Sequence, residues 1–305
     1  VHYIDELPEV IQKLQPSSAF CLDQHSEEQF RSHGPEISTN SEALIEALTD
    51  ARVIKTEDEL DCLRKASQVN DKAYERVIRH WKPGMYEYQA KAMFTEVQMS
   101  HGLQQDAYNG IYASGPNSAI LHYVSNTRKT QDGELFLIDA GFEYKGYAAD
   151  FSRTFPVNGR FTSDQAAVYD AVLTAQKQVI EAIRPGVRME DLHMMAARTM
   201  MEGLLEMGII KGSLDDLMEA NIFALFFPHG LGHFLGLDTH DVGGYPKGVE
   251  RIDRPGIFYL RARRELEAGM VITIEPGIYF VPAVLEPALH DPTKRMFLNT
   301  EKLHQ

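Results

Sequence analysis

The sequence predicts an α+β fold in which helices and antiparallel strands are interleaved along the chain. Two observations lead to this prediction. Apolar residues recur at helical spacing in four segments, and two strand-like runs flank a tight turn between residues 133 and 155. No short tandem repeat or low-complexity tract interrupts the pattern, and an apolar content of 44% can fill a sizeable core in 305 residues.

Residues 1–50 differ from the rest of the chain. Residues 1–22 hold two short apolar clusters, and residues 26–40 are polar with little periodicity. We interpret residues 1–50 as a partial N-terminal domain with a linker, and residues 51–305 as the main domain. Because the first residue is Val1 rather than a methionine, the start of the gene product is expected to be missing.

The helices of the main domain carry recognisable ends. Thr56, followed by three acidic residues, predicts an N-cap, and the apolar rhythm of residues 60–77 predicts the helix behind it. A Lys-Pro-Gly sequence at residues 82–84 ends this helix, and residues 86–99 form a second one. Two more helices are expected over residues 164–183 and 189–207.

The strands follow from β-rich runs next to turn residues. Residues 133–139 and 147–155 flank a Tyr-Lys-Gly turn, which predicts a hairpin. A further strand is expected over residues 270–275, where an apolar run ends at a Pro-Gly pair.

Asp139 and Asp150 share one face of this hairpin. A turn centred on Tyr144 and Lys145 places them directly opposite each other, and a turn one residue later makes them diagonal neighbours. Two carboxylates held so close cannot both stay ionised at low cost unless a cation lies between them. The structural alternative is that Asp139 caps a strand end and Asp150 forms an ion pair with Arg153.

Three histidines occur within twelve residues of a Gly-rich stretch, at positions 229, 233 and 240. The glycines make a helix unfavourable between His229 and His233, and the glutamate of the helical zinc-protease pair is absent. Glycines beside histidines let backbone or a ligand come close. One such histidine is usually structural, but a set that includes His240 indicates metal binding or acid–base chemistry.

Glu275 ends the strand expected over residues 270–275. A carboxylate at the end of a buried strand is costly unless it is paired or binds a metal, and the alternative is a glutamate that points into water. Together, two Asp, one Glu and one or more His make an oxygen-rich set with a nitrogen donor. This set suits Mn²⁺, Co²⁺ or Fe²⁺ better than a cysteine-bound structural zinc, and two such ions can generate a hydroxide nucleophile at neutral pH.

The composition excludes several classes of partner. Lys and Arg number 30 against 44 Asp and Glu, and the resulting charge of −14 repels nucleic acid and anionic membranes. The central apolar run at residues 222–227 is too short to cross a bilayer, and no basic-then-apolar signal segment opens the chain. With only Cys21 and Cys62, a reducing compartment is expected, and we expect a cytoplasmic protein.

Six motifs from about Arg52 to the C-terminus resemble those of the pita-bread metallopeptidases, family M24, which include prolidase, aminopeptidase P and methionine aminopeptidase. The motifs are Leu121-His122-Tyr123, Ile138-Asp139-Ala140-Gly141, Ala149-Asp150-Phe151-Ser152-Arg153-Thr154-Phe155-Pro156, His229-Gly230-Leu231-Gly232-His233, His240-Asp241-Val242-Gly243-Gly244 and Glu275-Pro276-Gly277-Ile278-Tyr279. The insertion at residues 245–263 and the segment at residues 280–304 resemble prolidase more than the bacterial aminopeptidase P enzymes.

The resemblance implies a curved antiparallel sheet flanked by helices and a role for each motif residue. The implied ligands of two divalent ions, with Mn²⁺ preferred, are Asp139, Asp150 as a bridge, His233 and Glu275. The implied catalytic residues are Glu275 as general base, His229 and His122, and the implied substrate contacts are His122, His240, Arg261 and Tyr108. Arg261 matches an arginine that grips the substrate's C-terminal carboxylate in prolidase, although it also lies in an Arg-rich run typical of a charged surface.

One departure from the family pattern concerns the metal site. The family has a second bridging glutamate on a strand near its C-terminus, and this chain ends at Gln305 before such a segment. We therefore expect residues 51–305 to be a catalytic domain truncated before its last strand, which binds a second ion weakly and has impaired activity.

The resemblance implies hydrolysis of Xaa-Pro dipeptides by a homodimer. The alternatives are an Xaa-Pro aminopeptidase that acts on longer peptides, a catalytically impaired relative that binds without turnover, and a metal-free hydrolase resembling creatinase. Cleavage of Xaa-Pro compared with Xaa-Pro-Xaa separates the first two possibilities.

Overall fold

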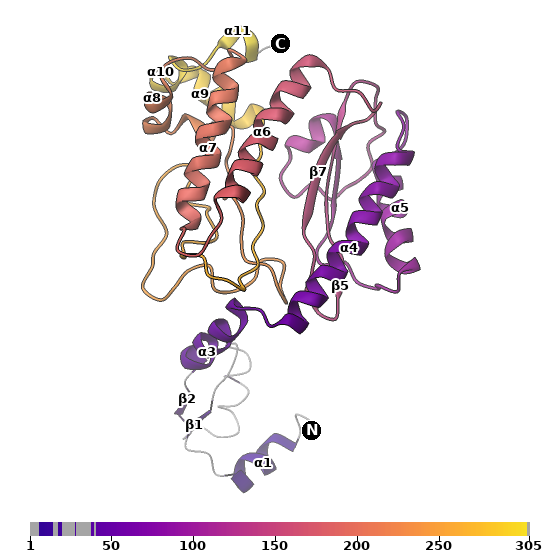
Figure 1. Ribbon diagram of the computed structural model, residues 1–305, viewed down its shortest axis with the longest axis vertical. Helices are drawn as coiled ribbons and strands as arrows, with labels where there is room; N and C mark the ends of the chain where they lie inside the picture. Colours follow the sequence, from indigo (N-terminus) through magenta and orange to yellow (C-terminus); the bar gives the residue numbers. More distant parts are fainter. Residues whose placement is uncertain (1–5, 15–17, 20–27, 29–37, 40, 304–305) are drawn as a thin grey trace. The chain divides into compact units, whose positions relative to one another are not determined.

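The computed structural model describes residues 6–14, 18–19, 28, 38–39 and 41–303 (Figure 1). The chain divides into two compact units, Val1–Ile54 and Lys55–Gln305. Helices α1 (Leu7–Leu14) and α3 (Ser41–Val53) and the parallel strands β1 (Ser18–Ala19) and β2 (Ser38–Thr39) belong to the first unit. Cys21 and most of residues 26–40 lie outside the described residues, and the division at residue 50 into a partial domain and a main domain stays a prediction.

The second unit opens with a pair of packed helices, α4 (Glu57–His80) and α5 (Glu87–Ser100). Thr56 caps α4 as predicted: its hydroxyl accepts the Glu59 N–H, and the Glu59 carboxylate accepts the Thr56 N–H at 2.7 Å. This reciprocal capping box satisfies two N–H groups that the first turn cannot pair internally. Both predicted helices are confirmed: α4 begins directly after Thr56 and ends at His80, before the Lys-Pro-Gly sequence, and both ends of α5 lie one residue later than predicted.

Strands β3 (Ile111–Ser114), β4 (Leu135–Ala140) and β7 (Phe151–Pro156) form an antiparallel sheet in the order β3-β4-β7. The short strands β5 (Glu143–Tyr144) and β6 (Tyr147–Ala148) extend the β4–β7 register to a turn at Lys145 and Gly146, both of which have positive φ. The predicted hairpin is confirmed. Its turn is centred one residue later than the first alternative, so Asp139 lies opposite Ser152.

The main core lies between α4, α5 and one face of this sheet. Trp81 stacks on Phe136 with ring centroids 4.5 Å apart, and Phe94 contacts both Tyr74 and Tyr112 edge to face. These rings are almost fully buried and join α4 and α5 to β3 and β4. The sheet is therefore held rigidly on one side, which fixes the strand ends that carry the aspartates.

A second helical pair and several short helices complete the unit. Helices α6 (Ser163–Ala182) and α7 (Met189–Glu206) pack side by side, as Figure 1 shows, and confirm the remaining two helix predictions. The short elements are η2 (Gly115–Ala119), α8 (Leu214–Glu219), η3 (Ile222–Leu225), α9 (Pro282–His290), α10 (Pro292–Arg295) and α11 (Thr300–Leu303). None of the helices in the described ranges has the length and apolar content needed to cross a membrane.

The strand predicted over residues 270–275 is wrong as a regular strand. Residues 271–275 run antiparallel to residues 231–235 and accept or donate three backbone hydrogen bonds, but only one isolated bridge forms, between Phe234 and Ile272. The reason is local. The His233 N–H, which a regular ladder would pair with a carbonyl, instead donates to the Thr273 hydroxyl at 3.0 Å.

Candidate active site

Asp139 and Asp150 lie on one face of the β4–β7 hairpin as diagonal neighbours, because Asp139 pairs with Ser152. The chain next to them passes so close to its partner that Gly141 has no room for a side chain: a Cβ there would lie 1.7 Å from the Ala149 carbonyl oxygen. Asp150 makes its ion-pair contact with His233, whereas Arg153 lies over the Phe151 ring. The alternative in which Arg153 neutralises Asp150 is therefore wrong.

Tyr108 joins the two aspartates. Its hydroxyl lies 2.5 Å from Asp139 Oδ1 and 2.9 Å from Asp150 Oδ1. A phenol carries one proton and can donate to only one of these oxygens at a time. Burial, together with the charges of Asp139 and Asp150, holds the Tyr108 pKa well above its usual value, so this proton stays in place.

Asp139 and Asp150 accept too few hydrogen bonds to compensate two negative charges at this distance. Burial raises the pKa of Asp139 to about 6, and repulsion from Asp150 and Glu275 acts in the same direction. Such a raised pKa marks a group whose charged form lacks compensation. A cation beside Asp139 and Asp150 would supply it.

His233 lies between Asp150 and Glu275. Its Nε2 is 3.2 Å from Asp150 Oδ2 and 3.2 Å from Glu275 Oε1, and its Nδ1 is 2.9 Å from the Phe234 carbonyl oxygen. A carbonyl oxygen only accepts, so Nδ1 carries a proton; Nε2 donates a second proton to the carboxylates while the ring is charged and would offer them a lone pair only after losing it. Burial lowers the His233 pKa, but the hydrogen bonds to Asp150 and Glu275 outweigh it and raise the pKa to about 10.

The extended pairing of residues 231–235 with residues 271–275 positions His233 and Glu275. Gly232 is required there, since a Cβ would lie 2.0 Å from the Thr273 carbonyl oxygen. The Thr273 hydroxyl accepts the His233 N–H and donates to Glu275 Oε1 at 2.9 Å. The Glu275 side chain is 32% exposed, against 12% for Asp150 and 5% for His233, so water can reach it more easily than either of them.

Four predicted ligands therefore form one connected group of side chains: Asp139, Asp150, His233 and Glu275. Within the described residues, no three acidic, histidine or cysteine side chains are already arranged around one point as ligands. The four side chains instead form hydrogen bonds or ion pairs with one another or with Tyr108. Their chemistry fits a divalent cation, because three carboxylates and one imidazole nitrogen face the same place and only the single charge of protonated His233 compensates the carboxylates.

His229 and His240 flank this group on the Gly-rich segment. His229 donates from Nδ1 to the Gly230 carbonyl oxygen, and its Nε2 lies 3.2 Å from the Tyr279 hydroxyl; burial lowers the His229 pKa. His240 packs edge-on against His233, with ring centroids 4.5 Å apart. Burial, His233 and Arg261 together lower the His240 pKa. Both rings are therefore neutral at pH 7.

Two predicted residues are less tightly connected to the group. Arg261 is exposed and acts on His240 only through its charge. His122 lies on the exposed loop that follows η2, in a left-handed conformation with φ of 58°. In the part of the chain that the structure describes, its imidazole makes no hydrogen bond, ion pair or ring contact.

Three contributors to the site were missed in the sequence. Tyr279 was quoted within a motif without a role, and its hydroxyl pairs with His229. Thr273 lies two residues before Glu275, so period-two alternation in the extended segment could have indicated that they share a face. The buried ion pair of Lys55 with Asp241, at 3.0 Å, joins residues 186 positions apart, and no local signal predicts it.

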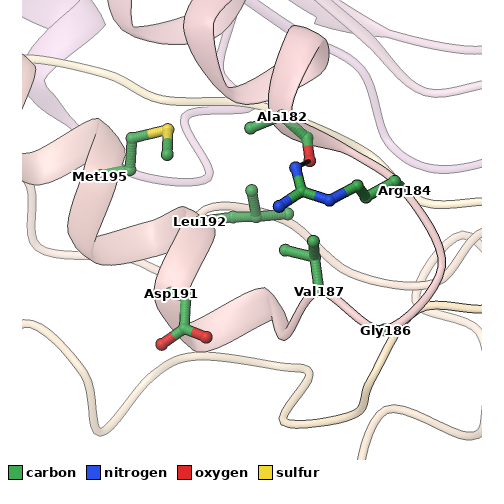
Figure 2. A pocket seen from close by; sticks show the side chains of 7 residues that line it. All are labelled: Ala182, Arg184, Gly186, Val187, Asp191, Leu192 and Met195. Carbon is green, nitrogen blue, oxygen red and sulfur yellow. Dashed lines mark hydrogen bonds between the residues drawn. The ribbon is translucent and has the colours of Figure 1, made fainter.

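A cavity of about 330 Å³ lies elsewhere, at the connection between α6 and α7 (Figure 2). Apolar side chains such as Val187 and Leu192 line it together with Arg184 and Asp191. It contains none of the predicted site residues, and the Arg184 guanidinium donates to the Ala182 carbonyl oxygen at its edge.

Comparisons with known proteins identify the family of the chain. The model of metallopeptidase family M24 matches residues 61–294. The chain is 43% identical over 318 residues to the Xaa-Pro dipeptidase of Homo sapiens, covering all of this chain and 64% of that protein. It is 42% identical over 264 residues to the probable Xaa-Pro aminopeptidase pepP of Botryotinia fuckeliana (strain B05.10), covering 86% of this chain and 57% of that protein.

Solved structures give the same assignment. A zinc-substituted Escherichia coli aminopeptidase P in complex with product superimposes with a TM-score of 0.82 at 34% identity, covering 92% of this chain and 64% of that one. The predicted pita-bread α+β fold is thereby confirmed. The chain spans slightly less than two thirds of the length of the Homo sapiens and Escherichia coli relatives. Because the family match covers most of its residues, the chain belongs to metallopeptidase family M24.

Proposed function

We propose that the chain is an Xaa-Pro dipeptidase that hydrolyses the bond before proline with the help of divalent metal ions. The connected group of Asp139, Asp150, His233 and Glu275 carries this proposal, because such a concentration of partly buried negative charge needs a cation. The identity of 43% to a dipeptidase over the whole chain supports the choice of substrate.

Metallopeptidases of family M24 use divalent metals, and the residues of this site fit such ions. Asp139, Asp150, Glu275 and His233 would hold two of them, with Asp150 shared between both. The oxygen-rich ligand set favours Mn²⁺. Bound ions would supply a hydroxide nucleophile at neutral pH and stabilise the charge that develops on the substrate carbonyl.

The chain's own residues orient the substrate and move protons. Glu275 accepts the proton of the attacking water, since it is more exposed than Asp150 and Thr273 and His233 hold it through Oε1. His229 is neutral with its Nε2 beside the Tyr279 hydroxyl, so this pair can relay a proton to the leaving imino group. His122 and His240 line the substrate pocket.

Arg261 selects dipeptides. A guanidinium binds a carboxylate through two parallel hydrogen bonds, so Arg261 holds the free C-terminal carboxylate that follows directly after proline in an Xaa-Pro substrate. In a longer peptide this carboxylate lies at least one residue further away. The exposure of Arg261 beside His240 supports the role, because its donors are accessible to a ligand.

Comparison of two substrates tests the proposed specificity. With added Mn²⁺, we expect the purified chain to cleave Gly-Pro faster than Gly-Pro-Gly, and Arg261→Met to raise KM for Gly-Pro without affecting Gly-Pro-Gly. Arg160→Met serves as control, because Arg160 is an exposed arginine on the loop after β7. Equal effects of Arg261→Met on both peptides would contradict the role of Arg261.

Aminopeptidase P activity is the second candidate, favoured by the structural match to the Escherichia coli enzyme. Preferential cleavage of Gly-Pro-Gly would select it. A cytoplasmic location and a homodimer complete the proposal, and sedimentation of the purified chain tests the dimer. Residues 51–305 form the catalytic domain in this proposal, and residues 1–50 belong to a partial N-terminal domain with a linker.

A further inference from the structure

Glu87 has a fully buried carboxylate that lies outside the group of proposed metal ligands. It is the first residue of α5, and its two oxygens accept five hydrogen bonds. Oε1 accepts from the Ser114 N–H, the Ser114 hydroxyl and the Asn117 amide at 2.7–3.1 Å. Oε2 accepts from the Tyr123 hydroxyl at 2.7 Å and the Arg128 N–H at 3.0 Å.

All five donors to Glu87 belong to neutral groups of one loop. Ser114 ends β3 and Arg128 closes the loop, so a single carboxylate holds both of its ends. Asn117 lies in η2, and Tyr123 lies near the middle. Backbone hydrogen bonds from the first turn of α5 to the Asn126 and Arg128 carbonyls add to the same closure.

The loop held by Glu87 carries His122. Within the described part of the chain its imidazole makes no hydrogen bond, ion pair or ring contact, so we take its position to depend on the backbone. That backbone is left-handed with φ of 58°, a conformation that a non-glycine residue keeps only when its surroundings impose it. The neighbouring Tyr123 is 9% exposed, and its hydroxyl donates a hydrogen bond to Glu87. Tyr123 is therefore the residue next to His122 that fixes the loop backbone.

We infer that Glu87 is a positioning residue for His122, acting through the hydroxyl of Tyr123. The inference rests on the proposed function, in which His122 contacts the substrate. Glu87 itself does not touch the substrate. Its carboxylate sets the loop so that His122 meets the scissile bond in a fixed geometry, and misplacement by about 1 Å can cost about 100-fold in rate.

Two variants and one control test this role. Tyr123→Phe removes one hydroxyl, and Glu87→Gln replaces an acceptor oxygen with an amide nitrogen that cannot accept. Glu134→Gln is the matched control: Glu134 pairs with the Arg128 guanidinium at the same end of the loop but makes no contact with Tyr123. We expect kcat/KM for Gly-Pro to fall at least about 10-fold in both test variants and less than about 2-fold in the control.

A double-mutant cycle with His122→Ala distinguishes positioning from general stability. If Glu87 acts through His122, Glu87→Gln should reduce kcat/KM no further once His122 is removed, although the melting temperature still falls. Additive losses of activity in the double variant would overturn the inference. So would a His122→Ala variant with full activity.

The imidazole NMR signal of His122 gives a test that needs no activity. We assign the signal by its loss in His122→Ala and expect it to shift or broaden in Tyr123→Phe and Glu87→Gln, but not in Glu134→Gln. If the wild-type chain cleaves no Xaa-Pro peptide, the proposed function fails, but the NMR signal still tests whether Glu87 and Tyr123 fix the position of His122. An unchanged signal in Tyr123→Phe would overturn the inference.

Discussion

Glu87 is fully buried and Asp139 partly buried, and these two carboxylates near the ends of secondary-structure elements differ in the supply of hydrogen-bond donors. Five hydrogen bonds end on Glu87, and although burial raises its pKa, the bonds from Tyr123, Ser114 and Arg128 lower it overall. Asp139 shares the single proton of Tyr108 with Asp150, and its pKa is raised to about 6.

The difference shows two ways in which the fold surrounds a carboxylate away from water. The Glu87 carboxylate is fully satisfied by neutral donors and needs no further ligand. The group around Asp139 lacks donors and places like charges together, which costs stability until a cation arrives. A third solution is the Lys55–Asp241 pair, in which a buried lysine supplies the cation permanently.

The largest effect is expected at the group that lacks donors. Asp150→Asn removes the carboxylate shared with Tyr108 and His233, so we expect Xaa-Pro hydrolysis to fall more than about 1,000-fold, or about 4 kcal/mol in transition-state stabilisation. In EDTA the same variant should differ little in stability from the wild type, since the repulsion of Asp139 and the attraction to charged His233 are both removed. Activity assays and chemical denaturation measure the two quantities, and a strongly destabilised metal-free variant would contradict the comparison.

The Lys55–Asp241 pair should show the next largest effect. Lys55→Met leaves the Asp241 carboxylate buried without its cation, and we expect the free energy of unfolding to fall by about 3 kcal/mol. The double variant Lys55→Met, Asp241→Asn should recover much of this loss, because no buried charge remains. Urea denaturation of the wild type, the single variant and the double variant measures these free energies. A double variant as unstable as Lys55→Met would show that the buried Asp241 charge does not cause the loss of stability.

Glu87→Gln should destabilise the chain by about 2 kcal/mol with or without metal. The glutamine retains one acceptor oxygen, but its amide nitrogen faces donors that then lose their partners. Denaturation with and without EDTA gives the measurement. A loss that appears only in the metal-bound protein would mean that Glu87 belongs functionally to the metal group.

The smallest effects concern the pH dependence of stability, which should have opposite signs for Asp139 and Glu87. Asp139 has a folded pKa of about 6, above its unfolded value, so its contribution favours the metal-free fold at low pH and is lost as pH rises through 6. Glu87 has a lowered folded pKa, so its contribution is present above its unfolded value and is lost as pH falls. As pH rises from 4 to 6 in EDTA, urea denaturation should therefore show Asp139→Asn gaining stability relative to the wild type, by up to roughly 1 kcal/mol per pH unit. Glu87→Gln should lose stability relative to the wild type as pH rises toward the ordinary pKa of a glutamate, and should change little above it.

Local signals in the sequence predicted the elements that depend on neighbouring residues. The Thr56 cap and the Tyr-Lys-Gly turn use contacts a few residues apart, so α4 and the β4–β7 hairpin were found with nearly correct ends. Residues 270–275 were assigned to a regular strand because alternation predicts an extended chain but not the side-chain hydrogen bond of Thr273 that interrupts the ladder. Glu87 looked like an ordinary acidic residue at a helix start.

The sequence predicted those site residues that belong to recognisable motifs. The motif residues Asp139, Asp150, His233 and Glu275 lie together in the fold, although their role as ligands stays a prediction. Tyr108 and Lys55 act across 31 and 186 residues, and such distant pairings depend on the packing of whole elements. No spacing rule connects them to their partners.

Calorimetric titration of the metal-free chain with Mn²⁺, in two pH 7 buffers of different ionisation enthalpy, tests the central claim most directly. A cation that enters between Asp150 and Glu275 must displace the proton that holds His233 charged, since the pKa of His233 is about 10. We therefore predict binding that releases about one proton per chain and is lost in Asp150→Asn. Binding without proton release, or unchanged binding in Asp150→Asn, would contradict the assignment of this group as a metal site.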